Sequence, residues 1–349
     1  MSFAIRQFLA GLAAIGLLTG ATSALSNSVS GEAFGVSVDA AGVVVGPTPH
    51  VVLPPDGGMV SDRLLRIAVP NLASSATLEV VTTGSIGPGS ASAQSSATVE
   101  GVNLLNGLVT AQLVVAMSSS TADGARATST GEGSALIGLR INGGAPADVT
   151  PAPNTRISIP GGTLILNEQI ASGDGVHVSA LTVNMIHVVL QDPLTGAIQA
   201  NIIVSSAHSD VNFVLAPNPP PNAGNVFMTG GGKLGTGRDI ATFGLNAGPR
   251  GGSGLHGQLQ YTDHGQKMNV HSLSIDSFDV IAGTPCVKFS GPARVNNADG
   301  YRFTVHQACD NGEPGHGKDS LDISVSGPGG LSYSRSGTLT GGNLQLHPE

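Results

Sequence analysis

The densest set of candidate metal ligands lies in residues 310–319. Its members are carboxylate and amide side chains: Asp310, Asn311, Glu313 and Asp319. Calcium prefers such oxygen ligands, but the spacing differs from that of an EF-hand loop. The alternative is a tight surface turn, because Asn311-Gly312 and Pro314-Gly315 are turn dipeptides. The sequence favours the turn and leaves calcium binding as a hypothesis.

Histidine is the second candidate for metal chemistry. Zinc sites need about three or four converging nitrogen or sulfur ligands. The candidates late in the chain are Asp263, His264, His271, His306 and His316. None of their spacings is a recognised zinc-ligand pair, so no zinc site or other cofactor is predicted.

Two short motifs resemble catalytic elements, but only superficially. Thr229-Gly230-Gly231-Gly232-Lys233 lacks the Ser or Thr that follows the lysine of a phosphate loop, and a flexible lead-in to a strand is predicted instead. Ser206 to Asp210 contains Ser, His and Asp, but a catalytic triad is assembled from distant positions. No catalytic residue is therefore predicted, and the chain is expected not to be an enzyme.

The first 24 residues have the pattern of a secretory signal peptide. Arg6 supplies the positive charge, Phe8 to Leu18 form the apolar region, and small residues end at Ala24. An N-terminal membrane anchor is the alternative, but the apolar run is shorter than the roughly 20 residues of a spanning helix. No second run of that length follows. We expect a secreted or cell-surface protein with no transmembrane segment after cleavage.

Composition points to an all-β protein. The chain has 50 glycines in 349 residues, 3% aromatic residues, no Trp and 11% charged residues, against about 25% charged residues in typical soluble domains. Turn residues divide it into short segments, as in strands joined by turns. The net charge is −8 and no Lys precedes residue 225, so the basic surface that nucleic acids require is missing.

The two cysteines predict one disulfide. Cys286 and Cys309 are the only cysteines, and an exported chain meets an oxidising environment. By strand alternation, Cys309 falls on the same inward face as Phe303, whereas Cys286 falls on the face opposite to that of Phe289. The pairing therefore needs a bulge, which Pro285 could allow.

Strand patterns and a proline run predict two β-sandwich or barrel-like domains. The clearest strand is Val176 to Leu190, where alternation places one set of side chains on a single face: Leu181, Val183, Met185, His187 and Val189. His187 is then expected to be a hydrogen-bonded core imidazole. Residues 216–224 contain three consecutive prolines and are predicted to be a linker between domains 25–215 and 225–349.

The first domain resembles the choice-of-anchor P family of bacterial exported proteins. The matching segments follow the family's order: Val45 to Pro49, Leu139 to Gly143, Thr150 to Thr155, Leu166 to Gln169, Val183 to Val188 and Ser206 to Val211. Together they cover most of residues 31–215. The resemblance implies a surface or secreted protein. Relatives carry varied C-terminal anchors, and the residues after Leu346 show no such anchor.

The second domain is similar to the companion domain that often follows that family. The segments that carry this resemblance are Phe227 to Gly232, Ala241 to Gly244, Gly257 to His264, Val270 to Ser272, Asp310 to Gly315 and Gly341 to His347. Together they cover nearly all of residues 225–349. No biochemical role is implied by either resemblance.

The function expected from the sequence is a non-catalytic structural or adhesive β-protein of the envelope or its surroundings. Its partner would be a cell-envelope component or another surface protein. The alternative is an extracellular module that binds calcium or a glycan through the Asp310–Asp319 loop. Sugar platforms usually use exposed aromatic rings, and two of the three tyrosines, Tyr261 and Tyr301, are predicted to face inward. A hydrolase would require a set of acid and base residues that the sequence does not display.

Overall fold

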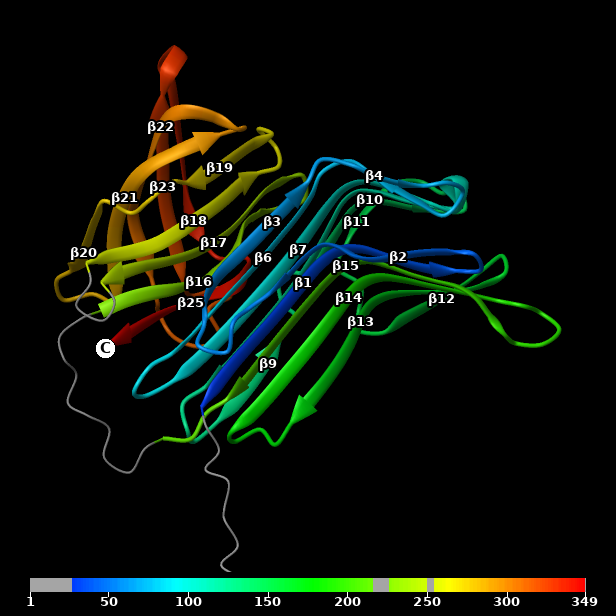
Figure 1. Ribbon diagram of the computed structural model, residues 1–349, viewed down its shortest axis with the longest axis horizontal. Coiled ribbons are helices and arrows are strands. Elements are labelled where there is room, and N and C mark those ends of the chain that lie inside the picture. Colours follow the sequence, from blue (N-terminus) through cyan, green and yellow to red (C-terminus); the bar gives the residue numbers. More distant parts are fainter. Residues whose placement is uncertain (1–26, 216–225, 250–253, 349) are drawn as a thin grey trace, which may run out of the picture.

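The structure, a computed structural model, describes residues 27–215, 226–249 and 254–348. The expected signal peptide and the linker at residues 216–224 lie outside the described residues. The described part of the chain forms three antiparallel sheets, which we call A, B and C (Figure 1). Two single 3-10 turns, η1 (Leu105–Gly107) and η2 (Pro328–Gly330), complete it. The predicted all-β fold is confirmed.

Sheets A and B come from the first domain. Sheet A has six strands in the order β12 (Thr155–Ile159), β13 (Gly162–Gly173), β14 (Val178–Gln191), β15 (Ile198–Asn212), β1 (Ser28–Ala40) and β2 (Val43–Val52). Sheet B runs in the order β11 (Ala147–Val149), β10 (Ala135–Ile141), β8 (Val109–Ala122), β7 (Ala91–Leu104), β5 (Ala73–Ser75) and β4 (Ile67–Val69). In addition, β6 (Leu78–Ile86) pairs with β7 and β3 (Gly58–Leu64), and β9 (Ala127–Thr130) pairs with β8.

Sheet C contains the described strands of the second domain. Its order is β24 (Leu331–Thr338), β23 (Ser320–Gly327), β22 (Ala298–Cys309), β21 (Cys286–Val295), β19 (Met268–Ser272), β18 (Leu255–Asp263), β17 (Asp239–Pro249), β16 (Val226–Thr236) and β25 (Gly341–Pro348). A short strand, β20 (Ser277–Ile281), pairs with β21. The sheet curves around its own core, which includes the fully buried Tyr261, Phe289 and Phe303. Tyr261 faces inward as predicted, and Tyr301 packs partly buried against this core.

Sheet B is the middle layer of three. One face packs on sheet A in a core that includes Leu78, Val99 and Ile202. The other face is covered by sheet C, whose strands β16, β17 and β25 contact β6, β7 and β8 (Figure 1). Because both faces are covered, almost every residue of β6 and β7 is buried, including many serines and threonines. The part of the chain before residue 216 and the part after residue 225 therefore meet along an extensive contact. We call this contact between β16, β17 and β25 of sheet C and β6, β7 and β8 of sheet B the seam.

Glycines bring the two sheets together at this seam. A Cβ atom on Gly244 of β17 would lie 2.4 Å from Cγ1 of Val81, and one on Gly341 would lie 2.1 Å from Cα of Gly133. No larger residue fits without moving a sheet. The Thr229–Lys233 motif lies in the same region, buried within β16. Its prediction as a flexible lead-in was wrong, because its glycines lie in a regular strand packed between neighbouring backbones.

The predicted face of β14 was also wrong beyond its midpoint. Leu181, Val183 and Met185 face the core, but the next core residues are Ile186 and Val188, so His187 points away from it. The alternation shifts in the same cross-strand row of β13 and β15, where Asn167 (φ 51°) and Ser205 (φ 61°) adopt left-handed backbone conformations.

His187 lies on the outer surface of sheet A rather than in the core. Its Nδ1 is 2.9 Å from Glu168 Oε2, and its Nε2 is 2.6 Å from Asn201 Oδ1. The imidazole is hydrogen-bonded, as expected, but to polar groups of that surface.

The predicted disulfide is present. Cys286 and Cys309 are bonded and lie directly opposite each other in β21 and β22. The parity conflict is resolved by one extra residue in β22, because Phe289 lies opposite Val305 whereas Val287 lies opposite Ala308. The pairing of β22 with β23 shifts at the same place, between Val305 and Gln307. The bulge therefore lies in β22, before Cys309, rather than at Pro285.

Candidate functional site

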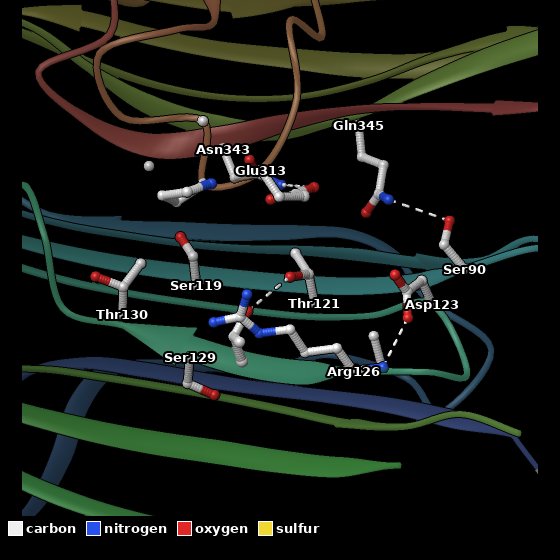
Figure 2. A pocket seen from close by; sticks show the side chains of 15 residues that line it. Ser90, Ser119, Thr121, Asp123, Arg126, Ser129, Thr130, Glu313, Asn343 and Gln345 are labelled. Carbon is white, nitrogen blue, oxygen red and sulfur yellow. Dashed lines mark hydrogen bonds between the residues drawn. The ribbon is translucent and has the colours of Figure 1, made fainter. Parts of the chain in front are cut away.

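A polar pocket of about 430 Å³ opens where the end of sheet B meets sheet C (Figure 2). One wall is the β8–β9 hairpin, and the other is formed by β25 and the loop between β22 and β23. Its polar lining consists of hydroxyl, amide and charged side chains: Ser90, Ser119, Thr121, Asp123, Arg126, Thr128, Ser129, Thr130, Glu313, Asn343 and Gln345. The volume falls within the range of about 300–1,000 Å³ that is usual for small-molecule sites.

The hairpin turn sets the position of Arg126. Asp123 Oδ1 accepts hydrogen bonds of 2.8 Å from the backbone N–H groups of Ala125 and Arg126. These bonds hold the pKa of Asp123 below its usual value. The Arg126 side chain leaves this turn and extends along the pocket, away from Asp123 (Figure 2).

The hydroxyl wall follows from the pairing of β8 with β9. Ser119 lies opposite Thr130, and Thr121 lies opposite Thr128, with their hydroxyl oxygens 3.3 Å apart in the second pair. Ser129 binds Ser120 and Ser179 at 2.7 Å on the side of sheet A. The wall is therefore fixed by strand pairing and by contacts with the sheet behind it.

The opposite wall includes the loop that the sequence singled out. Asp319 accepts hydrogen bonds of 2.8 Å from the backbone N–H groups of Asn311 and Leu344, using one oxygen for each. Asp310 does the same with Gly312 at 3.1 Å and Leu346 at 3.0 Å. These two carboxylates fasten the loop to β25. The backbone bends at residues 312–314, and its turn lies at residues 316–318, just after the two predicted turn dipeptides.

Calcium binding by this loop remains a prediction. The charges of Asp310 and Asp319 help to raise the pKa of Glu313, and the charge of Asp310 helps to raise that of Asp319. However, the oxygens of Asp310 and Asp319 point to backbone donors, and Asn311 uses its amide nitrogen to bind the carbonyl of Lys318 at 2.9 Å. Within residues 27–215, 226–249 and 254–348, no group of three or more His, Cys, Asp or Glu side chains could hold a metal ion. The arrangement is that of a structural loop.

Two carboxyl groups of this loop have unusual acidity. Burial raises the pKa of Asp319 to about 7, in spite of its two backbone hydrogen bonds, and the charge of Asp310 adds to the rise. Glu313 is exposed as a residue, but desolvation of its carboxyl group beside Asp310 and Asp319 raises its pKa to about 7 as well. Glu313 therefore changes charge near neutral pH at the edge of the pocket.

Two buried amides of β25 have unused hydrogen-bonding capacity. Asn343 donates to Glu313 Oε1 at 3.1 Å, and Gln345 donates to Ser90 at 3.1 Å. Their oxygens, Asn343 Oδ1 and Gln345 Oε1, accept no hydrogen bond from the described residues. The two residues are only 5% and 8% exposed. Both oxygens are fully buried, and Asn343 Oδ1 lies against Gly315, so these acceptors do not open into the pocket.

The remaining candidate residues from the sequence are spread over the molecule. His264 contacts Glu100 and Thr242, each at 3.0 Å. The other imidazoles each have a different neighbour: Gln260 for His271, Ser324 for His306 and Glu132 for His316. In β15, His208 lies on the outer face while Ser209 binds Ser118 in the interior.

The seam contains a buried carboxylate that the sequence did not indicate. Glu79 accepts hydrogen bonds from Gln260 at 2.9 Å and from Thr262 at 2.7 Å, and Asn269 lies 3.3 Å away. These partners are 181 to 190 positions away in the chain. No local pattern could have revealed them, and neither could any local pattern have marked Arg126 or the amides of β25.

Comparisons with known proteins do not assign a family. No family model matches the chain, and no curated protein matches it. Among solved structures, one match is a protein from Nitrosomonas europaea provisionally assigned as AttH, with 9% identity, a TM-score of 0.19 and coverage of 91% of this chain and 92% of that one. A likeness this weak identifies neither fold nor function. None of the helices in the described residues is long and apolar enough to span a membrane.

Proposed function

We propose that this protein is an exported, non-catalytic binding protein that takes a small polyhydroxylated ligand, such as a glycan, into the pocket between sheets B and C. The observation that carries the proposal is the lining of that pocket. Hydroxyl groups on one wall face amide side chains on the other. Sugars present alternating donors and acceptors that can satisfy such groups.

The seam supports this proposal because it holds both walls in place. Glu79 joins β6 to β18 and β19, and Lys233 of β16 donates to the carbonyl of Gly133 at 2.7 Å. Small-molecule sites are usually formed before the ligand arrives. A pocket bounded by paired strands and a fastened loop meets that requirement.

The pocket has no aromatic residue in its described lining, so stacking on a ring would not drive binding. Recognition would instead depend on hydrogen bonds to the polar side chains of the two walls. We therefore expect modest affinity and strong selectivity for the positions of hydroxyl groups, since each unpaired polar group in such a site is penalised.

The proposal can be tested by screening the purified chain against neutral and acidic saccharides. The pocket-filling variant Thr130→Tyr should abolish any binding that the wild type shows. Ser334→Tyr, which adds the same ring to an exposed position of β24, is the matched control. No binding of any saccharide, or binding that survives Thr130→Tyr, would contradict the proposal.

A structural or adhesive role is the second candidate, favoured by one end of sheet A. Exposed apolar side chains gather there on the β1–β2 hairpin and the β14–β15 loop: Val44 (76% exposed), Leu194 (94%) and Ile198 (66%). The two segments are adjacent, since Ala41 donates a backbone hydrogen bond to Gln199. Val44→Lys combined with Leu194→Lys should reduce surface adhesion without affecting saccharide binding.

Export is part of the same proposal. It is supported by the N-terminal pattern and by the resemblance to exported proteins. Mass spectrometry of the protein recovered from a bacterial culture should show a chain that begins near Leu25. Recovery of the full-length chain from inside the cell would contradict export.

A further inference from the structure

Arg126 lies beside the proposed ligand site, where its charge also helps to lower the pKa of the neighbouring Asp123. The ion pairs of the described arginines involve Arg294, Arg302 and Arg335, and Arg126 makes none within the described ranges. The adjacent Asp123 directs Oδ1 to the backbone of the turn instead. A guanidinium presents several donors in a planar fork that matches a carboxylate.

Hydroxyl groups surround this guanidinium. Thr121 and Thr128 lie on the paired strands from which the Arg126 turn projects, and Ser119 and Thr130 follow one row further along. Asn343 and Gln345 close the space from β25. A ligand whose anionic group binds Arg126 would therefore place its remaining part against side chains that can form hydrogen bonds with hydroxyl groups.

We propose that the ligand of this pocket is an acidic sugar, with its carboxylate on Arg126 and its hydroxyl groups on the Ser/Thr wall and the amides of β25. This inference rests on the proposed function and narrows it. The carboxylate would supply the countercharge that Arg126 lacks. The ring hydroxyls would pair with the hydroxyl groups of the Ser/Thr wall.

Glu313 gives this site a dependence on pH. The charged groups near it are Asp310, Lys318 and Asp319 from its own loop, while His316 is paired with Glu132 of the first domain. Arg126 and Asp123 lie on the facing hairpin, and Asn343 of β25 is neutral. With its pKa raised to about 7, Glu313 is mostly protonated at pH 6 and mostly ionised at pH 8. An anionic ligand should therefore bind more tightly at pH 6.

The test is calorimetric titration of the full chain with glucose, glucuronate and acetate at pH 6 and pH 8. Glucose and glucuronate differ only in the group at C6, so their comparison isolates the carboxylate. We expect glucuronate to bind at least about tenfold more tightly than glucose, in line with a charge-assisted hydrogen bond. Acetate has the carboxylate but no sugar ring, so it should bind too weakly to displace glucuronate.

Variants distinguish the effect of the Arg126 charge from an effect on folding. Arg126→Gln should remove that tenfold preference. Arg156→Gln, which removes the same charge from the exposed edge strand β12, should preserve it. Glu313→Gln should reduce the difference between pH 6 and pH 8, and the part that remains would come from Asp319, whose pKa is also raised to about 7. Thermal unfolding of each variant confirms that the fold is retained.

Four results would overturn the inference. Equal affinities for glucose and glucuronate would leave the pocket as a neutral-glycan site, with the proposed function intact. A preference that survives Arg126→Gln would show that another group binds the carboxylate. Acetate that competes as well as glucuronate would show a simple anion site and no sugar recognition. Binding of neither sugar, together with a negative saccharide screen, would remove the proposed function along with this inference.

Discussion

The ammonium group of Lys233 and the carbonyl oxygen of Gly133 lie 2.7 Å apart across the seam between sheets C and B, although 100 positions separate them in the chain. Lys233 is buried, and desolvation lowers its pKa to about 8. The second domain thus places an ionisable group inside the contact with the first. Because burial in this contact lowers the pKa of Lys233, the titration of Lys233 reports on the contact between the two domains.

The first prediction concerns the pH dependence of stability. Between about pH 8 and the unfolded value near 10.5, the unfolded chain holds the Lys233 proton while the folded chain has released it. The free energy of unfolding should therefore rise with pH over this window. Lys233→Met should lose the rise measured by thermal unfolding, whereas Lys288→Met, at an exposed position, should keep it. Parallel curves for wild type and Lys233→Met would contradict the prediction.

A second prediction addresses the close approach of the sheets. Gly244→Ala places a methyl group against Val81 and should cost about 1–3 kcal/mol in the free energy of unfolding. Adding Val81→Ala should recover part of that loss, because it removes the clashing atoms. Gly46→Ala is the control, since a Cβ there meets nothing within 4 Å. Urea unfolding of five chains measures the coupling: the wild type, Gly244→Ala, Val81→Ala, their combination and the Gly46→Ala control. Strictly additive effects would argue against the contact.

The third prediction concerns Glu79. Its carboxylate receives donors from three side chains of sheet C, so Glu79→Gln would place an amide N–H₂ group against them. We expect a loss of about 2–4 kcal/mol in the free energy of unfolding. Glu32→Gln removes a carboxylate from an exposed pair with His50 and should cost well under half as much. Comparable losses in chemical denaturation would mean that the network contributes little.

The fourth prediction separates the two interpretations of the Asp310–Asp319 loop. Since the oxygens of Asp310 and Asp319 already accept backbone hydrogen bonds, excess calcium should not raise the melting temperature of the full chain above that in chelator. A concentration-dependent rise that disappears in Glu313→Gln would instead establish the loop as a calcium site.

The fifth prediction tests the disulfide. The bond closes a loop with a sequence separation of 23 residues, for which chain-entropy arguments give about 3 kcal/mol of stabilisation. The double variant Cys286→Ala with Cys309→Ala should unfold at a lower temperature than the oxidised protein. A reducing agent should lower the wild-type melting temperature toward that of the variant and leave the variant unchanged.

Short-range patterns explain what could be predicted about the fold. Alternation over a few residues placed Leu181 and Val183 in the core, and turn dipeptides predicted the conformation of residues 310–315. The same reasoning failed at His187, because the left-handed residues Asn167 and Ser205 shift the alternation across sheet A. Neither is a glycine, so no residue type announces the shift.

By itself, the sequence determined the all-β class and the partner of Cys286, because strand period, turn residues and cysteine count are local or countable properties. It also drew attention to Glu313, although for calcium rather than for a pocket. Only the tertiary structure decided that Glu313 faces Arg126 and that Glu79 meets Thr262. These pairs come from separate domains, and their distance depends on how sheet C packs against sheet B. That packing is set by the close fit of whole sheet faces, which no short segment of the chain encodes.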